Sequence, residues 1–266
     1  MKYLYRTYQL FIAAPIIALF TLLTALVITI GCTLGNGHFW GYYPGRWWGR
    51  LVVRVLLLPV KVEGREHLEP KRSYVFVSNH QGAFDIFLIY GFLGRNFKWM
   101  MKHQLRKMPF IGRACAAAHH IFVDKRSPSK VKETYDKARE TLQDGMSLVV
   151  FPEGSRTFTG HMATFKRGAF MLANDLQLPV VPLTINGSFN VMPRMRDMKW
   201  VSWHPLRLTI HEPIAPKTLD AGHISQTIDE SYQAIMSALA PEYQGFVENP
   251  DSERHVRQQL PSVKMP

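Results

Sequence analysis

A histidine and an aspartate five positions apart, His80 and Asp85, are the residues of this chain best suited to acid–base chemistry. They follow an apolar run, residues 74–78, that is typical of a buried strand. We therefore expect His80 in the turn that leaves this strand and Asp85 in the first turn of a helix. A carboxylate placed there can accept the Nδ1 proton of the imidazole and leave Nε2 free to take a proton from a hydroxyl. The alternative is a chance pairing in which the aspartate only caps the helix.

A second polar turn, residues 151–156, follows another apolar run and has the sequence Phe-Pro-Glu-Gly-Ser-Arg. Gly154 lets backbone N–H groups approach a ligand, and Arg156 offers a planar fork for a phosphate. Glu153 is better suited to positioning Arg156 or a substrate than to acting as a base. A third turn, residues 124–126, is either a ligand site or simply a solvated turn.

Strands and helices alternate from residue 62 onward, which predicts an α/β fold with a mostly parallel sheet flanked by helices. The expected strands are 74–78, 97–102, 121–124, 147–151 and 179–185, and the expected helices are 84–91, 129–144 and 165–174. In such a sheet, functional residues gather outside the carboxyl ends of the strands. The three polar turns should therefore converge at one edge of the sheet.

The start of the chain predicts attachment to a membrane. Residues 10–34 carry no charge, and as a helix of roughly 37 Å they could cross a hydrocarbon core of about 30 Å. A second helix, residues 46–58, has an aromatic start and places Arg46, Arg50 and Arg54 on one face, as in segments that lie among lipid headgroups. Basic residues flank the first helix on both sides, which favours a hairpin with both ends on the cytoplasmic side.

Three segments follow from this organisation. We expect a membrane-anchoring pair of helices over 1–60, a catalytic domain over 61–248 and a polar tail over 249–266. A stretch rich in methionine and tryptophan, residues 192–203, is expected to pack in the core rather than to touch the membrane.

The charge balance restricts the partners. Lysine and arginine number 32 against 20 acidic residues, a net charge of +12, so an anionic lipid surface or a nucleic acid is the expected partner. Nucleic acid is the weaker candidate because no recognition motif occurs and many basic residues lie beside the anchor. A metal is not expected: paired Cys/His clusters are missing, and the adjacent His119 and His120 would point to opposite sides of a strand.

Four blocks of the chain, in the same order, resemble the 1-acyl-sn-glycerol-3-phosphate acyltransferase family of glycerolipid acyltransferases. The blocks are residues 79–85 (NHQGAFD), 121–126 (IFVDKR), 151–156 (FPEGSR) and 180–183 (VVPL), and the linking pieces 102–112 and 165–170 are also similar. The resemblance covers residues 60–215. Two departures occur: Lys125 stands where the family commonly has arginine, and Ser155 stands where threonine is common. The first leaves open whether Lys125 or Arg126 meets a phosphate.

The resemblance implies an enzyme of phospholipid synthesis that moves an acyl group from acyl-CoA or acyl carrier protein to the sn-2 hydroxyl of lysophosphatidic acid. His80 and Asp85 would be its catalytic general-base pair. The implied substrate-binding residues are Lys102, Lys125, Arg126, Glu153, Gly154, Ser155, Arg156 and Lys166. No cofactor or metal is expected beyond the thioester co-substrate.

The resemblance also implies a helix pair docked on one leaflet of a phospholipid membrane. A cytosolic thioester donor would place the catalytic domain at the cytoplasmic face, in a bacterial inner membrane. Two alternatives stay open. One is acylation of glycerol 3-phosphate, another lysophospholipid or a lyso amino-acid lipid, and the other is a noncatalytic lipid-binding protein of the membrane surface.

Overall fold

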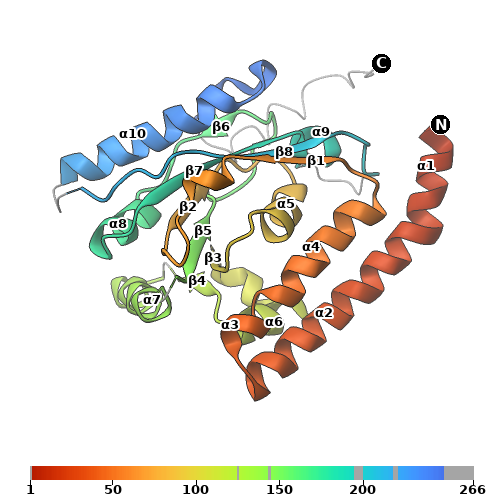
Figure 1. Cartoon of the computed structure of the whole chain (residues 1–266), viewed down its shortest axis with the longest axis horizontal. Coiled ribbons are helices and arrows are strands. Elements are labelled where there is room, and N and C mark those ends of the chain that lie inside the picture. The colour runs from red at the N-terminus through yellow and green to blue at the C-terminus, as the bar shows by residue number, and fades with distance from the viewer. Residues whose placement is uncertain (1, 125, 143–144, 195–199, 218–220, 249–266) are drawn as a thin grey trace.

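The computed structural model describes residues 2–124, 126–142, 145–194, 200–217 and 221–248, and a seven-stranded sheet lies at the centre of this part of the chain (Figure 1). The strand order is β1-β8-β7-β2-β5-β3-β4. Strands β7, β2, β5, β3 and β4 run parallel, β8 pairs antiparallel with β7, and β1 pairs parallel with β8. The strands are β1 (Val60–Glu63), β2 (Val75–Ser78), β3 (Phe97–Lys102), β4 (Ile121–Val123), β5 (Ser147–Val150), β7 (Val180–Asn186) and β8 (Leu206–Ile210). The predicted α/β fold with a mostly parallel sheet is confirmed.

Helices cover both faces of the sheet (Figure 1). Helix α5 (Phe84–Phe92) lies on one face, and α7 (Pro128–Thr141), α8 (Gly168–Asp175) and α10 (Ala221–Ala238) lie on the other. Helix α4 (Tyr43–Val55) packs on α5, and α2 (Ala14–Leu34) packs on α4 and α6 (Ile111–Ala117). The remaining elements are α1 (Lys2–Tyr8), η1 (Gln9–Ala13), α3 (Gly37–Trp40), α9 (Ser188–Val191), short 3₁₀ turns at Arg65–His67, His103–Lys107 and Pro241–Tyr243, and a small sheet of β6 (Met162–Ala163) and β9 (Phe246–Val247).

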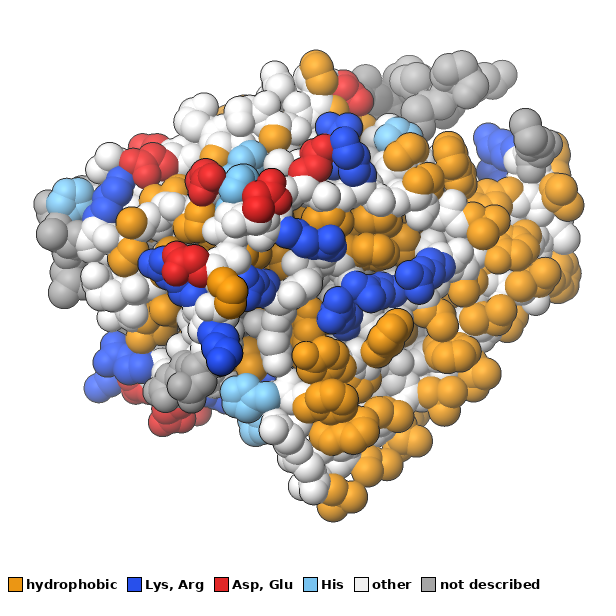
Figure 2. Space-filling model, viewed as in Figure 1, with side chains coloured by type: hydrophobic (Ala, Val, Ile, Leu, Met, Phe, Trp, Pro, Cys, Tyr) orange, Lys and Arg blue, Asp and Glu red, His pale blue; other side chains and the backbone are white. Residues whose placement is uncertain are grey.

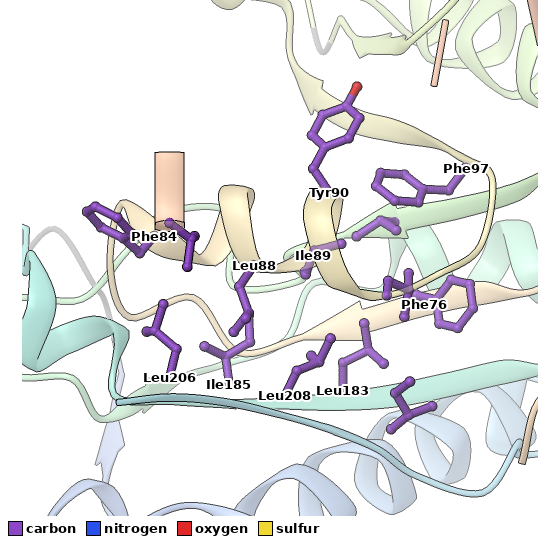
Figure 3. Packing of buried hydrophobic residues seen from close by; sticks show 14 of the residues in the cluster. Phe76, Phe84, Leu88, Ile89, Tyr90, Phe97, Leu183, Ile185, Leu206 and Leu208 are labelled. Atoms are coloured by element: carbon purple, nitrogen blue, oxygen red, sulfur yellow. The ribbon is translucent and has the colours of Figure 1, made fainter. Parts of the chain in front are cut away.

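Strand β2 lies in the middle of the sheet, and all four of its residues are buried. Phe76 joins the cluster of side chains between the sheet and α5 (Figure 3), whereas Val75 and Val77 join the cluster beneath α7, α8 and α10. Successive side chains of a strand point to opposite faces, so an apolar residue at each of these positions suits a strand that is covered on both sides. This burial holds the end of β2 in place.

Two expectations are wrong. No strand holds both of the adjacent histidines, because His119 has a positive φ of 57° in the turn after α6, and β4 begins only at Ile121. The stretch 192–203 does not bury its tryptophans: Trp200 is 42% and Trp203 is 57% exposed. Of the methionines in this stretch, Met192 packs against the core, and residues 195–199 lie outside the described residues.

Residues Lys2–Leu34 form one helical stretch that is long and apolar enough to cross a membrane. Most of its large apolar side chains face outward, and Figure 2 shows them covering the face formed by α1 and α2. The aliphatic and aromatic side chains on this face are more than a third exposed, as expected for a surface that meets lipid rather than protein. The predicted anchor helix is therefore present, and it starts earlier than the uncharged segment.

The second predicted helix, α4, is present, and part of its apolar face packs inside the protein. Val52 and Val53 are each 1% exposed and belong to the core cluster with residues of α5. Two apolar residues stay exposed: Trp47 within the helix and Leu57 just beyond its end are each 60% exposed. Helix α4 therefore packs against the apolar helix α2 on one side and against α5 on the other.

A buried glutamine fastens the first helix to the rest of the protein. Gln9 is 6% exposed, its Nε2 donates to the carbonyl of Val201 at 2.8 Å, and its Oε1 accepts from the Val201 N–H at 2.9 Å. Two tyrosine hydroxyls add to this contact by donating to carbonyls at the end of α4, Tyr5 to Leu56 and Tyr8 to Val55, each at 2.7 Å. These carbonyls have no partner within the helix, so the tyrosines satisfy them.

Replacing Gln9 by alanine should release the anchor helix from this position. The change removes both hydrogen bonds and leaves two backbone groups of Val201 without their partner, at a cost of about 1–3 kcal/mol for each group that stays buried. We expect a lower midpoint of thermal unfolding in detergent. The control is Gln226→Ala, because the Gln226 amide bonds an exposed carboxylate four residues away. Equal midpoints for Gln9→Ala and the parent would contradict this account.

Candidate active site

His80 and Asp85 meet at the carboxyl end of β2. The Nδ1 atom of His80 lies 2.7 Å from Oδ2 of Asp85. The Asp85 side chain is 0% exposed and the His80 side chain is 15% exposed, so the pair is buried but the imidazole still reaches the surface. Because the carboxylate holds Nδ1, Nε2 is the nitrogen that remains for a substrate.

The same carboxylate oxygen also holds the backbone of the turn. Oδ2 of Asp85 accepts the N–H of Gln81 at 2.8 Å and the N–H of Gly82 at 3.0 Å. The aspartate lies in the first turn of α5, where the helix dipole stabilises a negative charge. One side chain thus fixes the path of the chain around His80 and the orientation of its ring.

An aromatic ring supports the imidazole from one face. The rings of His80 and Phe151 are stacked, with centroids 3.9 Å apart and planes 10° apart. Phe151 in turn stacks on Trp99, with centroids 5.5 Å apart. Phe151 comes directly after β5 and Trp99 lies on β3, so neighbouring strands carry this stack. The bond to Asp85 and the stack together restrict the imidazole to one plane.

The Glu153 side chain is buried and accepts hydrogen bonds from two backbone N–H groups. It is 1% exposed, its Oε1 accepts the N–H of His80 at 2.7 Å, and its Oε2 accepts the N–H of Ala163 at 2.8 Å. Burial raises the pKa of Glu153 to about 8, although the two N–H bonds oppose this shift. The sequence pattern allowed this residue to position Arg156 or a substrate. The structure instead has its carboxyl group holding the backbone of His80.

The turn that follows Glu153 depends on a glycine. Gly154 has a φ of +79°, and a Cβ atom there would lie 2.3 Å from Nζ of Lys166. Lys166 therefore lies next to the turn, and its backbone N–H donates to the carbonyl of Pro152 at 2.9 Å. The N–H of Gly154 donates to the carbonyl of Phe151 at 2.9 Å, so it is not available to a substrate oxygen in this geometry. Ser155 follows in the same turn and is partly buried.

Arg156 is partly buried close to the catalytic pair. Burial lowers its pKa, the charge of Asp85 raises it, and the charge of Arg194 lowers it. Its backbone carbonyl accepts a hydrogen bond from Nη1 of Arg194 at 2.6 Å. Arg156 is thus a partly buried cation whose pKa responds to the charges of Asp85 and Arg194.

The third polar turn, which follows β4, lies at the outermost strand of the sheet and therefore apart from His80 and Asp85. β4 is separated from β2 by β5 and β3, which amounts to roughly 14 Å at about 4.8 Å per strand. The Arg126 side chain is 72% exposed and pairs with Asp124, with Nε at 2.8 Å from Oδ1. Lys102 ends the intervening strand and is exposed. Lys125, the other candidate for phosphate binding, lies outside the described residues.

Several supports of the site were not singled out from the sequence. Asn79 exchanges two hydrogen bonds with the backbone of Ile185 on β7, at 2.9 and 2.8 Å, and so ties the start of the turn to the next strand. Gln81 donates to the carbonyl of Gly160 at 2.9 Å. Phe151 and Arg194 are further examples. The sequence did offer one signal for three of these residues: Asn79, Gln81 and Phe151 lie in the blocks 79–85 and 151–156, close to the candidate catalytic residues.

Within the described ranges, no group of three or more His, Cys, Asp or Glu residues is placed to hold a metal ion. His120 is 2% exposed and bonds the hydroxyl of Tyr90 at 2.8 Å and the N–H of Trp99 at 3.2 Å. Burial lowers the pKa of His120 to about 3, so the ring is neutral at physiological pH. It belongs to the packing beneath the site.

Glu153→Gln should separate a bracing role from contact with a substrate. An amide offers one acceptor oxygen where the carboxyl group meets two N–H donors, so one bond is lost and the His80 backbone is less well held. We expect kcat to fall by about ten- to hundredfold, as a small misplacement of a catalytic group does, with KM for the acceptor nearly unchanged. A large rise in KM with unchanged kcat would show instead that Glu153 binds the acceptor.

The pH dependence of unfolding provides a control for this residue. The folded pKa of about 8 exceeds that of an exposed glutamate. The neutral carboxyl therefore contributes its full share of stability below pH of about 4.5 and loses it as the pH rises through about 8. The unfolding free energy of the parent should decline relative to that of Glu153→Gln over this range. A parallel pH dependence in both proteins would contradict the buried, neutral-favouring environment.

The family model described as Acyltransferase matches residues 59–186. A curated 1-acyl-sn-glycerol-3-phosphate acyltransferase of Saccharomyces cerevisiae is 33% identical over 174 residues, which cover 64% of this chain and 57% of the relative. One of Chlamydomonas reinhardtii is 30% identical over 187 residues, covering 70% of this chain and 54% of the relative. The chain thus spans only somewhat more than half the length of these relatives.

The fold is also that of a solved protein. The crystal structure of the 1-acyl-sn-glycerophosphate acyltransferase PlsC of Thermotoga maritima matches with a TM-score of 0.58 and 21% identity, over 92% of this chain and 100% of that chain. The matched region of the family model contains the histidine–aspartate turn and the turn after β5. Over residues 59–186 this chain therefore carries the domain described by the Acyltransferase family model, and it is similar to 1-acyl-sn-glycerol-3-phosphate acyltransferases.

Proposed function

We propose that this protein transfers an acyl group from a thioester to the sn-2 hydroxyl of 1-acylglycerol 3-phosphate and so forms phosphatidic acid. The single observation that carries the proposal is the 2.7 Å contact between Nδ1 of His80 and Oδ2 of Asp85, with the ring edge at the surface. The similar proteins of Saccharomyces cerevisiae and Chlamydomonas reinhardtii are 1-acyl-sn-glycerol-3-phosphate acyltransferases.

The chemistry needs one base. Nε2 of His80 takes the proton of the glycerol hydroxyl as its oxygen attacks the thioester carbon, and a tetrahedral oxyanion forms. Asp85 stays ionised and stabilises the imidazolium. When the oxyanion collapses, the carbon–sulfur bond breaks and the imidazolium returns the proton to the departing thiolate. The products are an ester and a free thiol, and His80 is again neutral.

The acceptor's phosphate would be held by cations at the carboxyl ends of the strands. Arg156 is next to the catalytic pair, and a guanidinium can bind two phosphate oxygens at once. Lys166 next to the turn of Gly154 adds positive charge, and Arg126 would do so from the end of the outermost strand, β4. Lys125 stays the other candidate that the sequence offers. These contacts would orient the hydroxyl toward Nε2 of His80.

The apolar N-terminal helix attaches the protein to a membrane. We infer further that the thioester is acyl-CoA or acyl carrier protein, that no cofactor takes part, and that the catalytic domain faces the cytoplasm at a bacterial inner membrane. These inferences rest on the chemistry of a cytosolic thioester and on the family.

The test is phosphatidic acid formation by purified protein in detergent. Lysophosphatidic acid should be acylated with acyl-CoA, with acyl carrier protein, or with both, and the His80→Ala variant should lose the product. His204→Ala is the matched control, because its ring bonds a neighbouring backbone carbonyl outside the site. The same assay should include glycerol 3-phosphate and other lysophospholipids. Acylation of one of these instead would change the acceptor, and no product from any of them would contradict an acyltransferase.

A further inference from the structure

A segment outside the family's recognised blocks is attached directly to the catalytic turn. Gly82 forms an isolated antiparallel bridge with Pro193, and the N–H of Ala83 donates to the carbonyl of Met192 at 3.1 Å. The approach is close, because a Cβ atom on Gly82 would lie 2.3 Å from Oγ of Ser188. The chain after α9 is therefore held against the residues between His80 and Asp85.

This attachment brings Arg194 to the site. Its Nη1 donates to the carbonyl of Arg156 at 2.6 Å, and its Cζ lies 4.4 Å from the centroid of the Phe158 ring. The hydrogen bond and the ring fix the plane of the guanidinium. Two arginines from different parts of the chain, Arg156 after β5 and Arg194 after α9, thus meet, and Arg194 directly follows the residue that pairs with Gly82.

Two neighbouring guanidinium groups in a partly buried place repel each other. The proximity shows in the pKa of Arg156, which burial lowers and the charge of Arg194 lowers further. The charge of Asp85 acts in the opposite direction and raises the pKa of Arg156. Oδ2 of this carboxylate is bonded to His80 and to two backbone N–H groups, whereas Oδ1 has no hydrogen-bond partner within the described residues. A dianionic group placed between the arginines would remove the repulsion and form charge-assisted bonds to both.

The chemistry of the acceptor sets how far its phosphate can lie from His80. Only one methylene carbon and one ester oxygen separate the carbon that bears the reacting hydroxyl from the phosphorus. A phosphate whose hydroxyl is at His80 must therefore lie near the turn 80–85. Arg194 directly follows Pro193, which pairs with Gly82 of this turn. Arg126, by contrast, follows β4, which is three strands away from β2 in the sheet.

We propose that Arg194 binds the phosphate of the acceptor together with Arg156, and that this pair selects phosphomonoester acceptors over uncharged ones. The proposal rests on the proposed function and names a residue that the family's blocks do not include. It predicts that removal of the Arg194 charge weakens only those reactions whose acceptor carries the phosphate.

The experiment compares two acceptors that differ only in that group, lysophosphatidic acid and 1-monoacylglycerol. For Arg194→Gln we expect kcat/KM with lysophosphatidic acid to fall by about ten- to hundredfold, mainly through KM, because a charged hydrogen bond is lost. With monoacylglycerol the loss should be less than about threefold. Arg194→Lys should recover part of the activity, since it keeps the charge but not the fork.

The matched control is Arg207→Gln. This arginine is 54% exposed on β8, so the variant loses the same charge away from the site and should behave as the parent with both acceptors. If the monoacylglycerol rate is too small to measure, equilibrium binding of both lipids to His80→Ala, with and without Arg194→Gln, replaces it. Only the binding of lysophosphatidic acid should weaken.

Equal losses with both acceptors would overturn the proposal and assign Arg194 to holding the turn. Unchanged kinetics with lysophosphatidic acid would also overturn it. A parent that does not acylate lysophosphatidic acid at all would instead contradict the proposed function, so the two failures are distinguishable.

Discussion

One buried carboxylate oxygen organises the active site. Oδ2 of Asp85 accepts three hydrogen bonds, from the His80 imidazole and from the N–H groups of Gln81 and Gly82. An isolated buried charge is costly, and these three donors together with the start of α5 compensate it. The same bonds fix the tautomer of His80 and the shape of the turn. The chemistry and the local fold therefore depend on one side chain.

The surroundings hold this turn from several directions. Glu153, in the turn after β5, accepts the N–H of His80, and Asn79 bonds the backbone of Ile185 on β7. The segment after α9 pairs with Gly82, and Val201, further along the chain, carries the bonds to Gln9 of the anchor helix. The anchor and the catalytic turn are thus attached to the same region of the chain. This arrangement places the active site at a set position relative to the apolar helix that meets the membrane.

Local patterns in the sequence sufficed for the central elements. β2, β3, β5 and β7 read as apolar runs, and the histidine–aspartate spacing implied their contact. The antiparallel β8 was not predicted, although Leu206, Leu208 and Ile210 alternate with more exposed residues. Local sequence patterns also did not predict which polar side chains become buried by contacts with distant parts of the chain. Glu153 reads as an exposed polar residue of a turn, yet β6 and the His80 backbone enclose it.

The sequence likewise did not predict the contact between Arg194 and Arg156, because these residues are distant in the chain and meet only when the segment after α9 packs on the turn. The proposed reaction requires His80 and Asp85 to work as one unit. The most direct test measures kcat/KM for His80→Ala, Asp85→Asn and the double variant with lysophosphatidic acid. We predict losses of about 10²–10⁴ for His80→Ala and no further loss in the double variant. Losses that multiply, or an active His80→Ala variant, would contradict the account.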